Sequence, residues 1–516
     1  MPRITNRFTA ALRGCLLFAI TFGSVGSAEI ATAQSGAFSG TGSMTTARSL
    51  HSATLLPNGQ VLIAGGESIP PAPGILASAE VYDPDAGRFR AAGTMMTARR
   101  MHTATLLPDD NVLIVGGYGE RGALASAELF NPLSGAFTAT GNLITARGGH
   151  TAILLPTGKV LVIGGYGTNA YPNVAPAELY DPASRTFSPA GAYVGRGGCD
   201  FCAPATLLAD GAVLFPGQYP AQLYDPASDS FSPSGMMISD QSAAARLTNG
   251  TVLLAGGEDC CGRSSSAELY NPMTHTFAST GHMARRRVWH TLNWLPNGMV
   301  LAAGGETDSC AANSCSFAGT EASAELYDPS AGEFIATSSM TTARETHTAT
   351  VLRDGRVLVA GGVSYGGIGI FHGSIASAEL YTPDVLVPAP ALVSVSGDGH
   401  GQGAIFHAGT THVAAREDPA AAGEDLDIEC TGLDSLNPPQ VAIGGRMAAV
   451  QTVSNAPGLP GVKHVRVRLP AGIEPGPAVP VRLSYVDRPS NEVTIAVRGE
   501  EAFTTAPGSH LERTTK

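Results

Sequence analysis

Charged side chains, and lysine in particular, are scarce in this chain of 516 residues. Asp, Glu, Lys and Arg make up only 14% of it, and the 31 basic residues include only three lysines. The formal net charge is −12 and no basic run is present, so we expect no nucleic-acid partner. No uninterrupted apolar run reaches 18 residues, so we expect no membrane insertion.

Residues 1–33 have the pattern of a secretory signal peptide. Three arginines precede the apolar run "CLLFAITFGSVG", and small residues follow, with cleavage expected after Ala28 or Ala33. The alternative is an ordinary amphipathic helix, which is disfavoured because no acidic residue precedes Glu29. We therefore expect a secreted protein, located outside the cell, at its surface or in the periplasm.

Glycine is abundant, with 63 residues, and much of it recurs at a fixed spacing. A short apolar run such as "VLIAGG" ends in a glycine pair once in about every fifty residues, which indicates a repeat architecture. The pairs are Gly65-Gly66, Gly116-Gly117, Gly164-Gly165, Gly256-Gly257, Gly304-Gly305 and Gly361-Gly362, and Pro216-Gly217 fills the gap between the third and fourth. Seven units result.

Each unit contains four short segments with the pattern of β-strands. A run such as "HSATLL" is joined by a turn such as "PNGQ" to "VLIAGG", which predicts a tight antiparallel hairpin. A third strand such as "SAEVYDP" ends at proline, and a fourth such as "RFRAAGTM" follows. We call these strands A, B, C and D; the D–A and B–C connections should share one face.

The last unit lacks a D strand, whereas the segment "AFSGTGSM" at 37–44 has the D pattern but no unit of its own. Pairing the two would close seven four-stranded sheets into a ring and remove an exposed sheet edge. The sequence therefore predicts an all-β fold, with a seven-bladed β-propeller closed by an N-terminal strand.

The glycine pair, the aromatic residue before Asp-Pro or Asn-Pro and the aromatic residue that opens strand D resemble kelch repeats over residues 36–385. The chain departs from that pattern because phenylalanine stands where the family often has tryptophan, at Phe89, Phe137, Phe187, Phe231, Phe277 and Phe334. Kelch propellers have unrelated functions, so the resemblance implies a fold and no ligand.

Residues 386–498 form a Pro-rich linker and then alternate in the manner of short strands, which predicts a small β-sandwich. The run "NAPGLPGVKHVRVRLPAGIEPGPAVPVRLSYVDRPSNEVTIAV" resembles an immunoglobulin-like module of secreted acidobacterial proteins. We expect Cys430 to be a buried thiol on a strand, and the polar tail 499–516 to be disordered.

An Arg-x-x-His motif occupies five D–A connections. One hypothesis is a binding site for an anion or sugar acid at the channel mouth; the other, favoured because the motif recurs in most units, is that each Arg and His ties its loop to a neighbouring blade. The residues are Arg48, Arg99, Arg147, Arg287 and Arg344 with His51, His102, His150, His290 and His347.

Tyrosines and cysteines of the same face are further candidates. Tyr118, Tyr166, Tyr219 and Tyr365, with Tyr171, could stack on sugar rings or partner side chains. Cys199, Cys202, Cys260, Cys261, Cys310 and Cys315 are candidates for disulfides in an exported protein. Cys199-Cys202 and Cys310-Cys315 are plausible local pairs, and a metal site of Cys with His282 or His290 is the alternative.

Two functions remain open. The favoured prediction is a non-catalytic propeller that binds a protein or glycan partner through the D–A and B–C loops, with no cofactor, metal or catalytic residue. The alternative is a copper-dependent carbohydrate or aldehyde oxidase, because the chain resembles galactose oxidase in combining a propeller with an immunoglobulin-like domain. That resemblance implies two tyrosines and two histidines as copper ligands, one histidine following a tyrosine, and no Tyr-His pair occurs here.

Overall fold

The computed structural model describes residues 36–69, 73–167, 175–191, 204–216, 220–237, 243–259, 262–311, 314–366, 371–385, 390–397, 399–433, 439–485 and 488–498. Within these ranges all regular structure is β-strand, as predicted. No helix there is long and apolar enough to cross a membrane. The signal-peptide prediction and the disordered-tail prediction concern residues outside these ranges.

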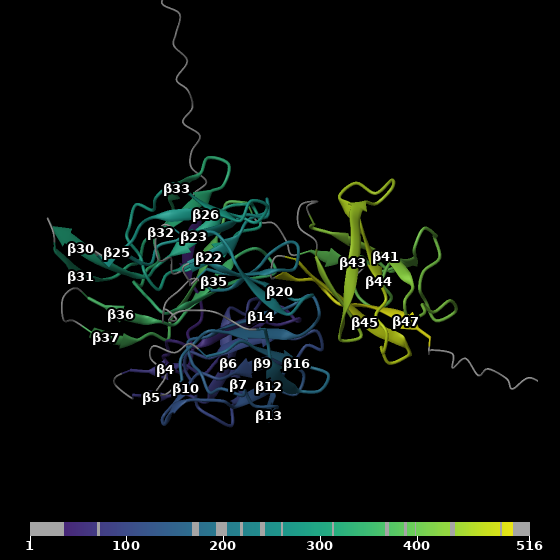
Figure 1. The fold of residues 1–516 in the computed structure, drawn as a ribbon, viewed down its shortest axis with the longest axis horizontal. Coiled ribbons are helices and arrows are strands. Elements are labelled where there is room, and N and C mark those ends of the chain that lie inside the picture. Colours follow the sequence, from purple (N-terminus) through teal and green to yellow (C-terminus); the bar gives the residue numbers. More distant parts are fainter. Residues whose placement is uncertain are drawn as a thin grey trace, which may run out of the picture. The chain divides into compact units, whose positions relative to one another are not determined.

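Seven four-stranded antiparallel sheets form the propeller blades (Figure 1). Blade one contains β2 (Ser52–Leu55), β3 (Val61–Ala64), β6 (Ser78–Asp83) and β7 (Arg88–Thr94); blade two β8 (Thr103–Leu106), β9 (Val112–Val115), β12 (Ala127–Asn131) and β13 (Ala136–Ala139). Blade three contains β14 (Thr151–Leu154), β15 (Val160–Ile163), β16 (Glu178–Asp181) and β17 (Thr186–Pro189); blade four β18 (Thr206–Leu207), β19 (Val213–Phe215), β20 (Gln222–Asp225) and β21 (Ser230–Pro233).

Blade five contains β22 (Ala243–Arg246), β23 (Val252–Ala255), β26 (Ala267–Asn271) and β27 (Thr276–Ser279). Blade six contains β28 (Thr291–Trp294), β29 (Val300–Ala303), β32 (Ala324–Asp328) and β33 (Glu333–Ala336). Blade seven contains β34 (Thr348–Val351), β35 (Val357–Ala360), β38 (Ala378–Thr382) and β1 (Ala37–Gly40). The first strands of neighbouring blades contact one another around the ring.

The second strand of each blade is apolar on both faces because neighbouring blades cover both faces of its sheet. All four residues of β3, "VLIA", are buried, and they divide between the apolar clusters on either side of blade one. The turn before β3 requires a left-handed residue, which Gly59 supplies with φ of 84°. The predicted hairpin is therefore confirmed.

The N-terminal strand closes the ring as the sequence predicts. β1 pairs antiparallel with β38, and Phe38 lies opposite Tyr381. Their ring centroids are 4.9 Å apart, the same separation as Tyr82 and Phe89 within blade one. Blade seven thus repeats, across 343 residues of sequence, a contact that blade one makes locally.

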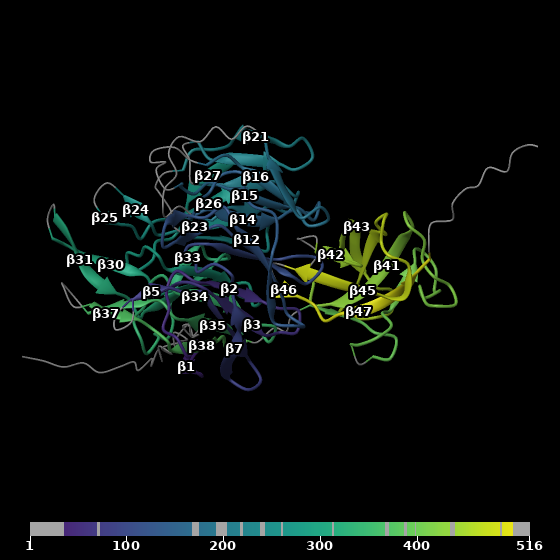
Figure 2. The same ribbon diagram turned by 90° about the horizontal axis from the view of Figure 1, so that it is seen from below.

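Five short hairpins extend B–C connections on one side of the ring, the side that we call the loop face (Figures 1 and 2). They are β4 (Glu67–Ser68) with β5 (Gly74–Ile75), β10 (Tyr118–Gly119) with β11 (Gly122–Ala123), β24 (Glu258–Asp259) with β25 (Gly262–Arg263), β30 (Glu306–Ala311) with β31 (Ser314–Thr320), and β36 (Val363–Tyr365) with β37 (Phe371–Ser374).

The C-terminal module is a small β-sandwich of nine strands around one apolar core. The strands are β39 (Ala391–Leu392), β40 (Ile405–His407), β41 (Asp425–Thr431), β42 (Gln440–Ile443), β43 (Arg446–Asn455), β44 (Val462–Arg468), β45 (Gly476–Tyr485), β46 (Arg488–Pro489) and β47 (Val493–Val497). β43 pairs with β42 near its start and with β44 beyond, so one strand joins the two layers. Cys430 is a buried free thiol, as predicted.

We predict that Phe38→Ala and Phe89→Ala destabilise the protein by similar amounts, about 2 kcal/mol each, through the loss of one aromatic pair. The midpoints of urea unfolding measure this. A Phe38→Ala protein that unfolds like the wild type, beside a destabilised Phe89→Ala protein, would show that β1 does not complete blade seven.

Candidate functional site

The arginine of each Arg-x-x-His motif is buried on the loop face in an ion pair within its own blade. Arg48 is 0% exposed; its guanidinium donates to the backbone oxygens of Gly65 and Ser78, each at 2.9 Å, and to Glu80 Oε1 at 2.9 Å. Glu80 also accepts the backbone N–H groups of Thr45 and Thr46. One guanidinium therefore joins the D–A loop to strands B and C.

The same ion pair recurs in five blades. The pairs are Arg48–Glu80, Arg99–Glu128, Arg147–Glu178, Arg287–Glu325 and Arg344–Glu379, with N–O distances of 2.5–2.9 Å. Burial lowers the pKa of Arg48, and the charge of Glu80 opposes this shift. The side-chain contacts of each arginine stay inside one blade, whereas its backbone ties the D–A loop to the preceding blade. The N–H of Arg99 donates to the backbone oxygen of Leu76 at 3.1 Å, and the backbone oxygen of Arg99 accepts from the N–H of Gly66 at 2.9 Å. The guanidinium groups have no exposed surface to offer a ligand, and a binding role for these arginines stays a prediction.

Four of the histidine side chains contact the preceding blade. In each, Nε2 lies within hydrogen-bond distance of a hydroxyl group: His51 to Thr348 at 3.0 Å, His102 to Ser52 at 2.9 Å, His150 to Thr103 at 2.9 Å, and His347 to Thr291 at 3.3 Å. Each hydroxyl belongs to the first residue of strand A in the preceding blade. The expectation of a tie to a neighbouring blade therefore holds for these four imidazoles.

The histidines are neutral at ordinary pH because they are buried. Burial, and next the charge of Arg99, lowers the pKa of His102 to about 3. Burial, and next the charge of the arginine of the same motif, lowers the pKa of His150, His290 and His347 likewise. Each ring packs under the first glycine of the preceding blade: a Cβ on Gly65 would lie 2.8 Å from His102 Cε1. The imidazole and the still closer backbone oxygen of Arg99, at 2.5 Å, thus leave no room for a side chain at Gly65.

The residues directly before the five histidines form a ring of backbone hydrogen bonds around the channel mouth. Leu50, Met101, Gly149, Trp289 and Thr346 all have positive φ, between 50° and 67°. The N–H of Gly149 donates to Met101, that of Met101 to Leu50, that of Leu50 to Thr346 and that of Thr346 to Trp289, over 2.9–3.3 Å. Four non-glycine residues in this conformation mark the mouth as strained.

Blades four and five lack the Arg-x-x-His motif in their sequence. Their D–A connections, 192–203 and 238–242, lie outside the described residues. His290 of blade six lacks the usual partner: the first residue of strand A in blade five is Ala243, which has no hydroxyl. Neither ring nitrogen of His290 makes a hydrogen bond.

The candidate tyrosines differ in exposure. Tyr166 is buried. The Tyr118 hydroxyl donates to the backbone oxygen of Tyr166 at 3.3 Å. The Tyr365 ring packs edge-on against the Phe317 ring, with centroids 5.5 Å apart. Tyr171 and Tyr219 lie outside the described residues. Their role in binding stays a prediction.

Four of the six candidate cysteines, Cys199, Cys202, Cys260 and Cys261, lie outside the described residues. Cys310 and Cys315 stand directly opposite each other in the β30–β31 hairpin. Cross-strand partners are close enough in the backbone for a disulfide. The Cys310–Cys315 disulfide stays a prediction.

Two carboxyl groups that sequence reasoning missed face each other between blades six and seven. In blades one and two, Glu67 after the glycine pair contacts Arg100 after the motif arginine, at 2.8 Å. The same two positions in blades six and seven hold Glu306 and Glu345, both buried. Comparing the positions after each glycine pair could have found this like-charge pair.

The environment of Glu345 favours its protonated form. Burial, followed by the charge and hydrogen bonding of Glu306, raises the pKa of Glu345 from an ordinary 4.5 to about 8, and the charge of Arg263 opposes this. Arg263 is ion-paired with Glu306 itself. Glu345 thus stands where blade two has the cation Arg100, and its environment favours the protonated form.

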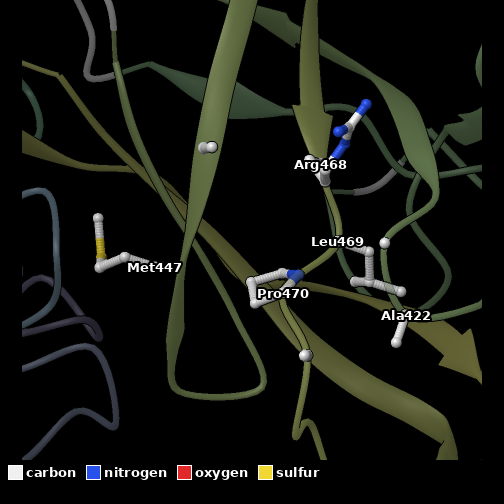
Figure 3. A pocket seen from close by; sticks show the side chains of 8 residues that line it. Ala422, Met447, Arg468, Leu469 and Pro470 are labelled. Atoms are coloured by element: carbon white, nitrogen blue, oxygen red, sulfur yellow. The ribbon is translucent and has the colours of Figure 1, made fainter. Parts of the chain in front are cut away.

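A hollow of about 460 Å³ lies elsewhere, in the C-terminal module. Figure 3 shows Ala422, Leu469 and Pro470 around it, with the Arg468 side chain extending away from them. Its lining is mainly apolar and lacks convergent polar groups, so it offers less chemistry than the loop face.

Comparison with known proteins was made at three levels. No protein family matches the chain, and no curated protein matches it. Among solved structures it is similar to a novel fungal alcohol oxidase of the AA5 family in complex with copper, at 17% identity and a TM-score of 0.57, over 90% of this chain and 99% of that one. At this identity the likeness shows a shared fold, and neither the kelch assignment nor the immunoglobulin-like one is confirmed.

This neighbour corrects the prediction of a non-catalytic binding propeller. The protein that shares the architecture over nearly its whole length is an oxidase. The finding supports the alternative prediction, an oxidase, better than the favoured one.

The described residues do not fit the neighbour's copper. Among them no group of three or more His, Cys, Asp or Glu side chains could hold a metal ion. Four of the five mouth imidazoles already use Nε2 for a hydroxyl group. None of the five residues before these histidines is a tyrosine.

We predict that Arg99→Lys destabilises the protein by about 3 kcal/mol. A lysine ammonium cannot reach Gly116, Ser126 and Glu128 at once, so it leaves a buried carboxylate poorly paired. Arg90→Lys, on the exposed strand β7, should change stability by less than about 0.5 kcal/mol. Equal urea midpoints for the two variants would contradict a structural role for the buried arginine.

We predict that Glu345 contributes stability that is lost as pH rises from about 6.5 to 8. Its pKa is raised to about 8 in the folded state, so in this window Glu345 holds a proton in the folded protein and none in the unfolded chain. Below about pH 6.5 the buried motif histidines, whose pKa values are lowered, act in the opposite direction. Glu345→Gln should make stability less dependent on pH in the upper window, whereas Glu67→Gln should leave the dependence as in the wild type. Thermal midpoints at several pH values measure this; parallel curves for the wild type and Glu345→Gln would contradict it.

Proposed function

We propose that this chain is an oxidase that acts on an alcohol group of a carbohydrate or of a small alcohol. The reaction class removes two electrons and two protons from the alcohol, which becomes an aldehyde, and passes them to dioxygen, which becomes hydrogen peroxide. The observation that carries the proposal is the likeness to a copper alcohol oxidase over 90% of this chain and 99% of the other.

The loop face at the channel mouth is the place we assign to this activity. It holds the strained residues before the histidines, the buried carboxyl groups of Glu306 and Glu345 and the two blades, four and five, that lack the Arg-x-x-His motif. Loops on a rigid propeller are a common location for binding and catalytic groups. The tyrosines Tyr118 and Tyr365, on hairpins of that face, would contact the substrate or a partner of carbohydrate or protein nature.

Copper, if bound, would supply the redox chemistry. The described residues do not provide its ligands, so we assign no step to it. The contribution that the mouth can make is to exclude water from the reaction, since its imidazoles and carboxyls are buried.

We also propose that the protein is exported, with residues 1–33 as the signal peptide, and that Cys310 and Cys315 form a disulfide after export. Support comes from the N-terminal sequence pattern and from the opposite placement of the two cysteines in their hairpin. We propose neither a nucleic-acid partner nor membrane insertion.

The test is hydrogen peroxide release by the full-length exported protein, supplied with copper, on D-galactose, glycerol, 1-propanol and aldehydes. Metal content is measured on the same sample, and a metal-stripped sample is the control. We expect peroxide with at least one alcohol, and its loss after stripping. A metal-free protein that releases no peroxide on any of them would overturn the oxidase proposal.

A further inference from the structure

Among the five motif histidines, His290 is the one whose imidazole makes no hydrogen bond to the preceding blade within the described part of the chain. Four motif histidines reach a hydroxyl group in the preceding blade. His290 occupies the same place, next to strand β28, but neither of its ring nitrogens makes a hydrogen bond. It is only 6% exposed.

The cause is a single residue. β22 lies beside β28 in the ring, and its first residue is Ala243, whereas the first strands of the other six blades all begin with serine or threonine. A buried polar group without a partner costs about 1–3 kcal/mol. The methyl group of Ala243 cannot form a hydrogen bond with the His290 imidazole. The protein therefore bears this cost at one position of the ring.

A second buried polar group without a partner lies nearby, the Thr346 hydroxyl, which makes no hydrogen bond. Thr346 is bonded to Trp289 in the ring of backbone hydrogen bonds: its N–H donates to the Trp289 oxygen at 3.3 Å. The charge of His290 acts on His347, so the two imidazoles are close. Trp289 and Thr346 are partly exposed, which places this cluster at the mouth.

We propose that His290, with the Thr346 hydroxyl, binds a hydroxyl group of the ligand at the mouth between blades five, six and seven. A neutral imidazole offers one donor and one acceptor, which matches an alcohol. The ligand class is therefore a polyol or sugar. This inference rests on the proposed function in one respect, that the ligand is the substrate of the oxidase. Binding of the ligand at this site can be measured whether or not the protein catalyses a reaction.

The chain offers a direct probe of this site. The chain contains only two tryptophans. Trp289 directly precedes His290, and Trp294 is the last residue of β28, the strand that begins directly after His290. Intrinsic tryptophan fluorescence of the full chain thus reports on the mouth of blade six. We would titrate the protein with D-galactose and with glycerol.

Three variants define the result. His290→Ala removes the unpaired imidazole, His290→Gln replaces it with an amide that can still donate and accept, and His102→Ala removes an imidazole that is bound to Ser52. We expect saturable binding in the wild type, at least about tenfold weaker in His290→Ala, partly restored in His290→Gln and unchanged in His102→Ala. Thermal unfolding should show a smaller loss for His290→Ala than for His102→Ala, because only the latter breaks a contact between blades.

The outcomes separate this site from the oxidase proposal. Binding that depends on His290 without peroxide release would support the site and overturn the oxidase. Peroxide release that His290→Ala leaves unchanged would support the oxidase and overturn the site. Equal sugar binding in the wild type and His290→Ala, or no binding by the wild type to either probe, would also overturn the site.

Discussion

A buried ion pair between an arginine and a glutamate holds the loop face together in five of the seven blades. Removing both charges from water is costly, so the pair is stable only with its full set of hydrogen bonds. Those bonds come from the end of strand B, the start of strand C and the turn before the arginine. The positions of these five loops, and of the histidine three residues after each arginine, depend on this contact.

The arginine side chain fixes the structure within its blade, and the histidine side chain joins neighbouring blades. The Arg48 guanidinium stays inside blade one, whereas the His102 imidazole of blade two reaches Ser52 of blade one. Where the preceding blade begins with Ala243, the second contact is missing while the first remains, since Arg287 keeps its ion pair with Glu325. The His290 imidazole therefore keeps its position in the blade but has no hydrogen-bond partner in the protein. We place the ligand-binding site at this difference between the copies of the repeat.

The sequence was sufficient for the fold and insufficient for the site. The glycine pairs, the hairpin turns and the orphan segment at 37–44 predicted seven blades and their closure, because local turn chemistry and strand counts determine both. Whether Arg48 faces a ligand or Glu80 could not be read from the sequence, since the two residues are 32 positions apart and strand C was treated only as a strand. The Glu306–Glu345 pair was missed for the same reason. The favoured function was wrong, because the absence of a Tyr-His pair weighed more than the shared architecture.

The account rests on five motif histidines that are buried and neutral, one of them without a partner. Imidazole nitrogen NMR of the full chain, followed from pH 7.5 to 4.5, tests this directly on its 13 histidines. We predict that five imidazoles remain neutral throughout, and that His290→Ala removes the one among them whose nitrogens carry no hydrogen-bond signature. Protonation of all 13 near pH 6.5, or five equally hydrogen-bonded neutral imidazoles, would contradict the account.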